Sequence, residues 1–404
     1  MRIFCLILFF LPAILKSQVI EFSKYNWNYF PEVKAADSLK SENGVLITLE
    51  RRITEVYVNR EDIFEEISIF HRKVRVESHD AIDRHNKIYV PVNNVIEIIN
   101  IRARFISPDG KITEVPQENI RQVSNLENEG DYKIFAIEGA QTGGEIEYFY
   151  VLRKKYNAYG TVYVQSNEPK ARVESIFSFP SKLSYIIKTY NGFPAFVTVN
   201  DTINEKTYMR SEAVFVPSLD DEKYAFYKAN LMRYEYTLAF NYYSSSLRIY
   251  SWSKISNNIY SHFFNLSRKE LSAAKSVITA LNLKNIAEEQ KIRKIEGWLK
   301  SEIAISEGIN YTIPIDKAIQ LKQTSKTGAT KLLVALLNQA GISFEIVVTC
   351  NQEERSFDPE FNGWNFLDDY SIPPQAAGIY YHGVERLNWI DIYGPPYSEP
   401  PYDG

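Results

Sequence analysis

The sequence predicts an α+β fold, in which an antiparallel, β-sandwich-like N-terminal domain is followed by an α+β domain. Two observations predict this class. Residues from about 45 to 200 hold closely spaced runs of β-branched and aromatic residues, separated by turn sequences. After residue 262, capped segments with helical apolar spacing replace them.

The strands of the N-terminal domain are predicted from runs in which apolar and polar residues partly alternate. Ser107-Pro108-Asp109-Gly110 and Thr142-Gly143-Gly144 separate some of these runs, and both have the composition of tight turns. Short strands joined by such turns favour an antiparallel sheet. The predicted strands are 45–58, 69–78, 98–106, 146–156 and 173–180.

Two helices are predicted from their capping sequences. Ser267 and Glu270 have the spacing of a capping box, ahead of an apolar-periodic run that ends near Leu281. Asn285 and Glu288 have the same spacing and predict the start of the second helix. The residues expected on one face of that second helix are Ile292, Ile295, Leu299 and Ile303.

A third helix and a strand are predicted further along the chain. The run over 330–340 is apolar and is followed by Gly341, a residue that commonly ends helices. The next run, over 342–349, has the composition of a buried strand. The second half of the chain therefore places a buried helix directly before a strand.

The N-terminus resembles a secretory signal peptide. Arg2 precedes an apolar run over 3–15, which Lys16 and Ser17 interrupt. This run is shorter than the roughly 20 residues of a bilayer-spanning helix. We therefore expect a cleaved signal and an exported protein, periplasmic or secreted, with an uncleaved N-terminal anchor as the alternative.

The domain organisation follows from these shifts in pattern, and the tail is set apart by its proline content. The predicted divisions are a signal peptide (1–18), an N-terminal segment (19–44), a β-rich domain (45–205), a connecting segment (206–262), the α+β domain (263–393) and a proline-rich tail (394–404).

Composition excludes several classes of protein. The chain has 404 residues, with 45% hydrophobic and 24% charged residues, which are ordinary values for globular proteins. This excludes a wholly disordered chain and a multispanning membrane protein. The formal net charge of −4, from 46 basic and 50 acidic residues, argues against a nucleic-acid partner.

The order of three segments carries a family resemblance. Residues 102–120 contain a "PDGK" hairpin, 136–155 contain "GGEIEYFY", and 167–180 begin with "NEP" and end with "FSFP". This order resembles a β-rich domain of unknown function that precedes transglutaminase-like domains in exported bacterial proteins. The resemblance implies that a transglutaminase-like domain follows.

Residues 325–348, SKTGATKLLVALLNQAGISFEIVV, resemble the core of the transglutaminase-like, papain-like superfamily. In that family a glycine precedes a nucleophilic cysteine, which opens a buried helix, and a histidine and an aspartate follow on strands. A cysteine at a helix N-terminus favours the reactive thiolate. The resemblance therefore implies a cysteine–histidine–aspartate site.

The chain departs from that pattern at the nucleophile, so the domain is predicted to be degenerate. Aligning Gly328 places Thr330 where the cysteine should be, and a threonine hydroxyl needs a strong local base to attack a substrate. We expect Thr330 to be a helix N-cap or first-turn residue. The remaining candidates for the site are His382 and Asp391, which lie only nine residues apart.

Cys350 is the only cysteine outside the predicted signal peptide, and it follows the predicted strand. We expect it to be an inert thiol. No cofactor or metal site is predicted. The sequence HDAIDRH over 79–85 is expected to be a polar loop or strand edge. Paired acids near 353–360 and 368–369 are expected to be solvated loop charges.

The clustered aromatic residues leave two interpretations open: packing between domains, or a surface that stacks on a sugar or grips a peptide. These residues are Tyr234, Tyr236, Phe240, Tyr242 and Tyr243.

Three functions are consistent with the sequence. The first is a non-catalytic binding or interaction protein of the bacterial envelope, with a peptide or glycan near Thr330 and the 358–371 loop. The second is a cysteine- or threonine-dependent peptidase or acyltransferase that would combine Thr330 or Cys350 with His382 and Asp391. The third is a truncated relic of such a protein.

Overall fold

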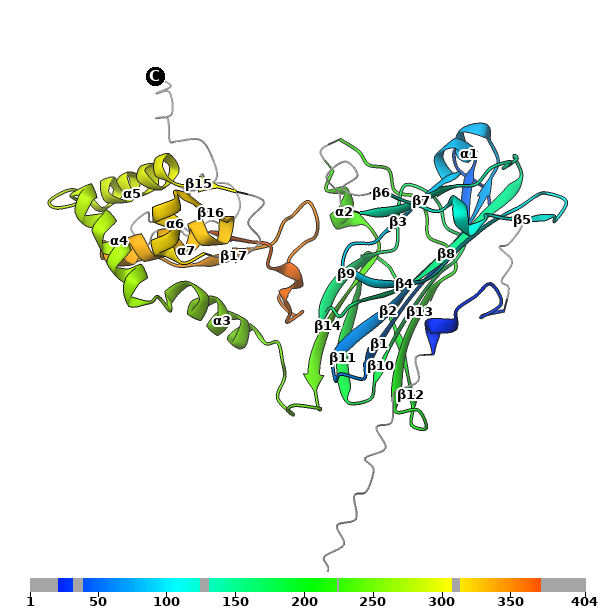
Figure 1. The fold of residues 1–404 in the computed structure, drawn as a ribbon, viewed down its shortest axis with the longest axis horizontal. Coiled ribbons are helices and arrows are strands. Elements are labelled where there is room, and N and C mark those ends of the chain that lie inside the picture. Colours follow the sequence, from blue (N-terminus) through cyan, green and yellow to red (C-terminus); the bar gives the residue numbers. More distant parts are fainter. Residues whose placement is uncertain (1–20, 32–38, 124–130, 224, 307–312, 372–404) are drawn as a thin grey trace, which may run out of the picture. The chain divides into compact units, whose positions relative to one another are not determined.

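The computed structural model describes residues 21–31, 39–123, 131–223, 225–306 and 313–371 (Figure 1). The chain divides into two compact units, Met1–Arg248 and Ile249–Gly404. Within the described residues, unit 1 is built mainly of β-sheet, and unit 2 is mainly helical with two short strand pairs. The predicted α+β fold, with the β-rich part first, is confirmed. The predicted signal peptide and proline-rich tail lie outside the described residues.

An eight-stranded sheet forms the body of unit 1 (Figure 1). All pairings between its strands are antiparallel except that of β1 with β10, which is parallel. In spatial order the strands are β12 (Val197–Asp201), β13 (Lys206–Ala213), β10 (Val173–Pro180), β1 (Val45–Val58), β2 (Phe64–Val76), β8 (Gly144–Lys155), β4 (Val95–Ile106) and β5 (Ile112–Glu114).

The described part of unit 1 also contains two three-stranded sheets. One contains β11 (Leu183–Tyr190), β14 (Arg233–Asn241) and β9 (Tyr159–Tyr163), and the other contains β3 (Lys87–Pro91), β7 (Tyr132–Ala136) and β6 (Arg121–Val123). The short helical elements of this unit are η1 (Phe22–Lys24), α1 (His79–His85), η2 (Gln117–Asn119) and α2 (Tyr227–Asn230).

Local sequence explains several of these elements. Gly110 donates its amide to the Ser107 carbonyl at 2.8 Å, which closes the predicted turn between β4 and β5. The sequence HDAIDRH is the helix α1 rather than a loop or strand edge, because the Ser78 side chain caps it by accepting from the Ala81 amide. The stretch 206–262, expected as a connecting segment, contains β13 and β14, which pair within unit 1, and most of α3 in unit 2.

Five helices make up most of the described part of unit 2. They are α3 (Trp252–Phe264), α4 (Arg268–Leu281), α5 (Glu288–Glu302), α6 (Ile315–Leu321) and α7 (Lys326–Gln339). The strand pairs are β15 (Ala304–Ile305) with β16 (Gln323–Thr324), and β17 (Val347–Thr349) with β18 (Asp369–Ser371). No helix among the described residues is long and apolar enough to span a membrane.

The predicted helix starts are partly confirmed. Ser267 and Glu270 form the predicted capping box at α4. At α5 the N-cap is Ala287 rather than Asn285, which instead adopts a left-handed conformation with φ of 58°. The predicted apolar face of α5 is confirmed, since Ile295, Leu299 and Ile303 are buried and Ile292 packs beside them.

Helix α7 lies at the centre of the unit 2 core. Every residue from Leu332 to Leu337 is at most 1% exposed, which is typical of a helix covered on all sides. Residues of α3, α4, α5 and α6 pack in the same core cluster. The helix therefore depends on its neighbours for burial, as its uniformly apolar sequence predicts.

The C-terminus of α7 is the expected one. Gly341 has a φ of +69°, which a residue without a side chain adopts at little cost. Its amide donates to Asn338, and the Ile342 amide donates to Leu337 at 3.0 Å, which is the Schellman arrangement. The strand predicted over 342–349 is shorter than expected, because β17 covers only 347–349, which pair with β18, and Phe344 forms an isolated bridge.

Candidate functional site

The N-terminus of α7 is the place where the family resemblance would put the nucleophilic residue. The helix begins at Lys326, four residues before the predicted start, because Ser325 is its N-cap and accepts from the Gly328 amide at 3.1 Å. Thr330 is therefore neither an N-cap nor a first-turn residue. The residue is 1% exposed, and its hydroxyl donates to the Lys326 carbonyl at 3.2 Å. That expectation was wrong because the capping serine lies further upstream.

Gly328 is explained by close packing. Thr324, the last residue of β16, is fully buried against the first turn of α7. A Cβ atom added at Gly328 would lie 2.0 Å from the Thr324 Oγ1 atom, far inside van der Waals contact. That oxygen has no hydrogen-bond partner in the part of the chain that the structure describes. The glycine before Thr330 thus serves the packing of the helix against β16.

Charged groups also lie beside this helix. Lys331 Nζ is 3.6 Å from Glu270 Oε1, and Glu270 also accepts from the Ile315 amide. Burial lowers the pKa of His262, and the positive charge of Lys331 lowers it further. The other two candidate residues, His382 and Asp391, lie outside the described residues.

Cys350 has the properties of an unreactive thiol. It follows β17, is half-buried, and donates its Sγ hydrogen to the Arg355 carbonyl at 3.2 Å. Burial and the Asp368 carboxylate raise the pKa of Cys350 to about 11. Because the thiolate is the nucleophilic form, this thiol is protonated and weakly reactive at neutral pH.

The acids near Cys350 are bound to their own loop. Asp368 accepts from Arg355 at 2.8 Å and from the Asn351 amide at 2.9 Å. Asp358 accepts from the Glu360 amide. Among the described residues, no group of three or more histidine, cysteine, aspartate or glutamate side chains could hold a metal ion.

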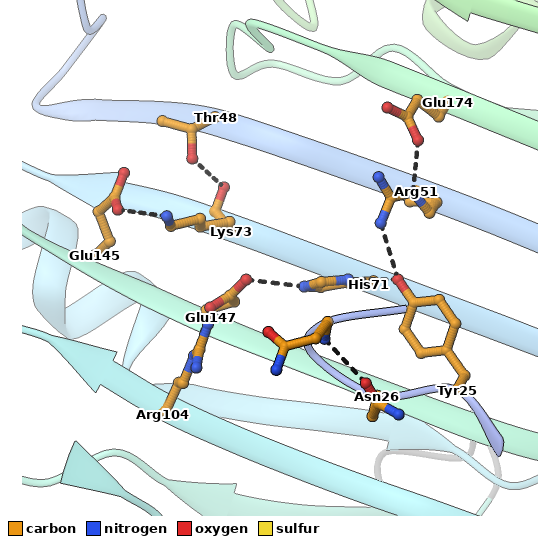
Figure 2. A network of polar contacts seen from close by, with 11 residues as sticks. Tyr25, Asn26, Thr48, Arg51, His71, Lys73, Arg104, Glu145, Glu147 and Glu174 are labelled. Atoms are coloured by element: carbon orange, nitrogen blue, oxygen red, sulfur yellow. Dashed lines mark hydrogen bonds and ion pairs between the residues drawn. The ribbon is translucent and has the colours of Figure 1, made fainter. Parts of the chain in front are cut away.

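A second polar site, which the sequence did not indicate, lies in unit 1. Residues 21–31, here called the N-terminal strap, cross one face of the eight-stranded sheet (Figure 2). The Glu55 carboxylate accepts from the amides of Glu21 and Phe22 at 3.1 and 3.0 Å. Phe22 and Tyr25 are 1% exposed and pack on the sheet. The strap is therefore held by both apolar and polar contacts.

A row of buried polar side chains lies beneath the strap (Figure 2). The Tyr25 hydroxyl is 2.6 Å from His71 Nδ1, and His71 Nε2 is 3.0 Å from Glu147 Oε1. Arg104 Nε donates to the other oxygen of Glu147 at 2.6 Å. Arg51 donates to the Tyr25 hydroxyl at 3.1 Å. A neutral His71 that carries its proton on Nε2 satisfies all these contacts.

Tyrosine, histidine and glutamate in this order resemble a catalytic relay. The pKa shifts of Tyr25 and His71, however, do not suit proton transfer. Burial raises the pKa of Tyr25, so its hydroxyl keeps its proton. Burial likewise lowers the pKa of His71. Tyr25, His71 and Glu147 are at most 5% exposed, so substrate has no access. The row fastens the strap to the sheet.

The comparisons with known proteins match the β-rich part and the overall fold. The family described as "Domain of Unknown Function with solved-structure structure (DUF3857)" matches residues 66–213. This confirms that the β-rich part contains a domain of unknown function, as the resemblance implies. No curated protein matches the sequence.

A similar fold is seen in one of the solved structures that match this chain. It is a protein from Parabacteroides distasonis ATCC 8503 described as a "putative protease", with 12% sequence identity and a TM-score of 0.57. The match covers 82% of this chain and 65% of that protein, so this chain spans about two thirds of its length or slightly less. A two-domain M1 zinc metallopeptidase mutant bound to L-tryptophan matches over 48% of this chain, with 7% identity and a TM-score of 0.27.

Substituting Gly328 tests the packing at the start of α7. We expect Gly328→Ala to destabilise the protein by about 1–3 kcal/mol, because the new methyl group overlaps Thr324 Oγ1. Adding Thr324→Ala should recover part of that loss, since it removes the overlapping atom. Urea unfolding followed by far-UV circular dichroism measures both effects.

Gly297 provides the matched control for Gly328. It lies within α5, and nothing stands within 4 Å of an added Cβ atom. Gly297→Ala should therefore stabilise the protein by about 0.5–1 kcal/mol through helix propensity. Equal effects of the alanine substitutions at 297 and 328 would contradict the packing argument.

The buried His71 predicts a dependence of stability on pH. Burial lowers its pKa from the ordinary value of 6.5, so the unfolded chain binds a proton first as the pH falls. The contribution of neutral His71 to the free energy of unfolding is therefore complete above about pH 6.5. It is lost as the pH drops from there toward the pKa of His71 in the folded state. The loss is at most about 1.4 kcal/mol per pH unit.

Hydrogen exchange of peptides from β1 and β2 measures this effect between about pH 7.5 and 5, a range above the ordinary carboxyl pKa values. The His71→Gln variant has no such titration, so its protection should fall less steeply with acidification than that of the wild type. If protection falls equally steeply in the two proteins, titration of His71 does not contribute to the pH dependence of stability.

Proposed function

We propose that this chain is an exported, non-catalytic binding protein of the bacterial envelope, and that unit 2 is a degenerate transglutaminase-like domain. The observation that carries the proposal is the state of Thr330. The sequence resemblance aligns Thr330 with the family's nucleophilic cysteine, and in the structure its hydroxyl is buried and donates to the Lys326 carbonyl. An attacking hydroxyl needs a base and an approach for substrate.

Cys350 does not replace the missing nucleophile. Its pKa, raised to about 11 by burial and Asp368, leaves little thiolate at neutral pH. Its hydrogen bond to the Arg355 carbonyl points the thiol at its own loop. Both nucleophiles that the sequence offers are thus unsuited to attack, which supports binding rather than catalysis.

The 358–371 loop is the proposed place for a peptide or glycan. This loop is attached to the start of α3, since Trp252 donates its indole nitrogen to the Pro359 carbonyl at 2.6 Å and its amide to Asn362. The Trp252 ring lies 5.7 Å from the ring of Phe357, which is 50% exposed. Phe357 directly precedes the loop, and an exposed aromatic ring beside a supported loop is suited to stacking on a sugar or an apolar side chain.

A second candidate is a peptidase or acyltransferase, which is favoured by the description of the Parabacteroides protein as a "putative protease". This candidate requires Thr330 or Cys350 to act with His382 and Asp391. The two candidates differ in one measurable property, the formation of a covalent intermediate.

Covalent trapping separates these candidates. The wild type and the Thr330→Ala, Cys350→Ala and His382→Ala variants are incubated with an electrophilic glutamine-based peptide probe, and the intact mass is measured. We expect no stoichiometric adduct on the folded wild type. Labelling of Cys350 after denaturation serves as the positive control for detection. An adduct that any one of these substitutions abolishes would establish a nucleophile and overturn the proposal.

A further inference from the structure

On the face of the eight-stranded sheet opposite the strap, three adjacent strands place six side chains in two cross-strand rows. Neighbouring strand residues point to opposite faces, so Glu50 and Arg52 face away from Arg51 and the strap. Glu50 pairs with Arg72 across β1 and β2, and Arg72 pairs with Tyr148 across β2 and β8. The second row is formed in the same way by Arg52, Phe70 and Tyr150.

One buried carboxylate holds three cations in these rows. Glu50 is fully buried, and its oxygens lie 2.9 Å from Arg52 Nη2, 2.5 Å from Arg72 Nη2 and 2.9 Å from Lys170 Nζ. Although burial acts against it, these cations hold the pKa of Glu50 well below its usual value. The cations exceed the negative charge that binds them.

The excess is close to one positive charge. The other acid that acts on Arg72 is Glu168, which is itself bound to His85 at 2.8 Å. Three cations against the two carboxylates Glu50 and Glu168 leave a single uncompensated charge. Burial, with Arg72 and Arg52 opposing Glu50, lowers the pKa of Lys170 to about 8. The site therefore suits a monoanion better than a dianion.

Unused hydrogen-bond donors border this charge. Neither the Tyr148 nor the Tyr150 hydroxyl has a hydrogen-bond partner in the part of the chain that the structure describes, and both residues are half-buried. The side chain of Arg52 keeps 30% of its surface exposed and that of Arg72 keeps 21%. Two hydroxyls and two guanidinium groups thus remain within reach of a ligand.

The same rows supply an aromatic surface. The Phe70 and Tyr150 rings are stacked at 5.4 Å, and Tyr148 lies 6.0 Å from Phe70. The guanidinium carbons of Arg52 and Arg72 lie 4.8 and 4.9 Å from the centre of the Phe70 ring. This stacking fixes the orientation of both guanidinium groups, which lowers the entropy lost when they bind an anion.

We propose that these two rows form a binding site for an organic carboxylate, either a small acid or the C-terminus of a peptide. Arg52 and Arg72 would neutralise the carboxylate, and the hydroxyls of Tyr148 and Tyr150 would donate to its oxygens. The half-buried rings of Tyr148 and Tyr150 would contact the apolar part of the ligand, and Phe70 supports them from beneath. This site lies within unit 1 and is independent of the proposed role of unit 2.

Isothermal titration calorimetry with the intact chain tests the site. The probes are the tripeptide Gly-Gly-Phe, its C-terminal amide, acetate and inorganic phosphate. We expect the free acid to bind in the millimolar range or tighter and the amide to bind at least about tenfold more weakly, because it lacks the charge-assisted hydrogen bonds. Acetate that binds as tightly as the tripeptide would identify a small acid as the ligand; weaker binding of acetate would identify a peptide C-terminus.

The variants are chosen to keep the buried carboxylate paired. Tyr148→Phe with Tyr150→Phe removes only the two hydroxyls, and Arg52→Gln leaves Arg72 and Lys170 on Glu50. Both variants should weaken binding of the free acid by about tenfold while unfolding at the same temperature as the wild type. Tyr89→Phe and Arg210→Gln, on exposed residues elsewhere in unit 1, are the matched controls and should bind normally.

Three results would overturn the proposal. They are equal binding of the acid and the amide, tighter binding of phosphate than of the tripeptide, and unchanged affinity in the folded Tyr148/Tyr150 and Arg52 variants. Absence of any carboxylate binding at millimolar concentration would overturn it as well. None of these results bears on covalent trapping at Thr330 or Cys350, so the two proposals fail separately.

Discussion

The charges that β1 buries on both of its faces are the constraint on which unit 1 depends. Glu50 and Glu55 are fully buried and Arg51 is 4% exposed, in a strand near the middle of the eight-stranded sheet. A buried charge without a partner costs several kcal/mol, so each of these residues requires a partner of opposite sign or a hydrogen-bond donor. The partners come from distant parts of the chain: the strap, β2, β10, β13 and Lys170.

This requirement links the strap, the parallel strand β10 and the face that holds the proposed carboxylate site. β10 runs parallel to β1 and brings Glu174 beside Arg51, and Lys170 reaches Glu50 just ahead of β10. On the face opposite the strap, Glu50 also pairs with Arg52 and Arg72. Together with Lys170, these side chains carry more positive charge than Glu50 neutralises. The pairing that stabilises the sheet thus creates the charge that the proposed carboxylate site would use.

The start of α7 in unit 2 is explained by packing. The core around α7 needs a small residue against Thr324 and a side chain that fits at position 330. A threonine meets this need, because its hydroxyl can donate to the carbonyl four residues earlier. Packing alone therefore accounts for Gly328 and Thr330, and neither residue needs a catalytic role to explain its place in the structure.

The sequence by itself determined the elements whose signals are local: the strands with alternating residues, the capping box at Ser267, the apolar face of α5 and the glycine that ends α7. It misplaced the starts of α5 and α7, where more than one residue could cap the helix. Only the tertiary structure decided the partners of the buried charges. Tyr25, His71 and Glu147 lie 46 and 76 residues apart along the chain, and no periodicity connects them, because strand pairing and register alone bring such residues together.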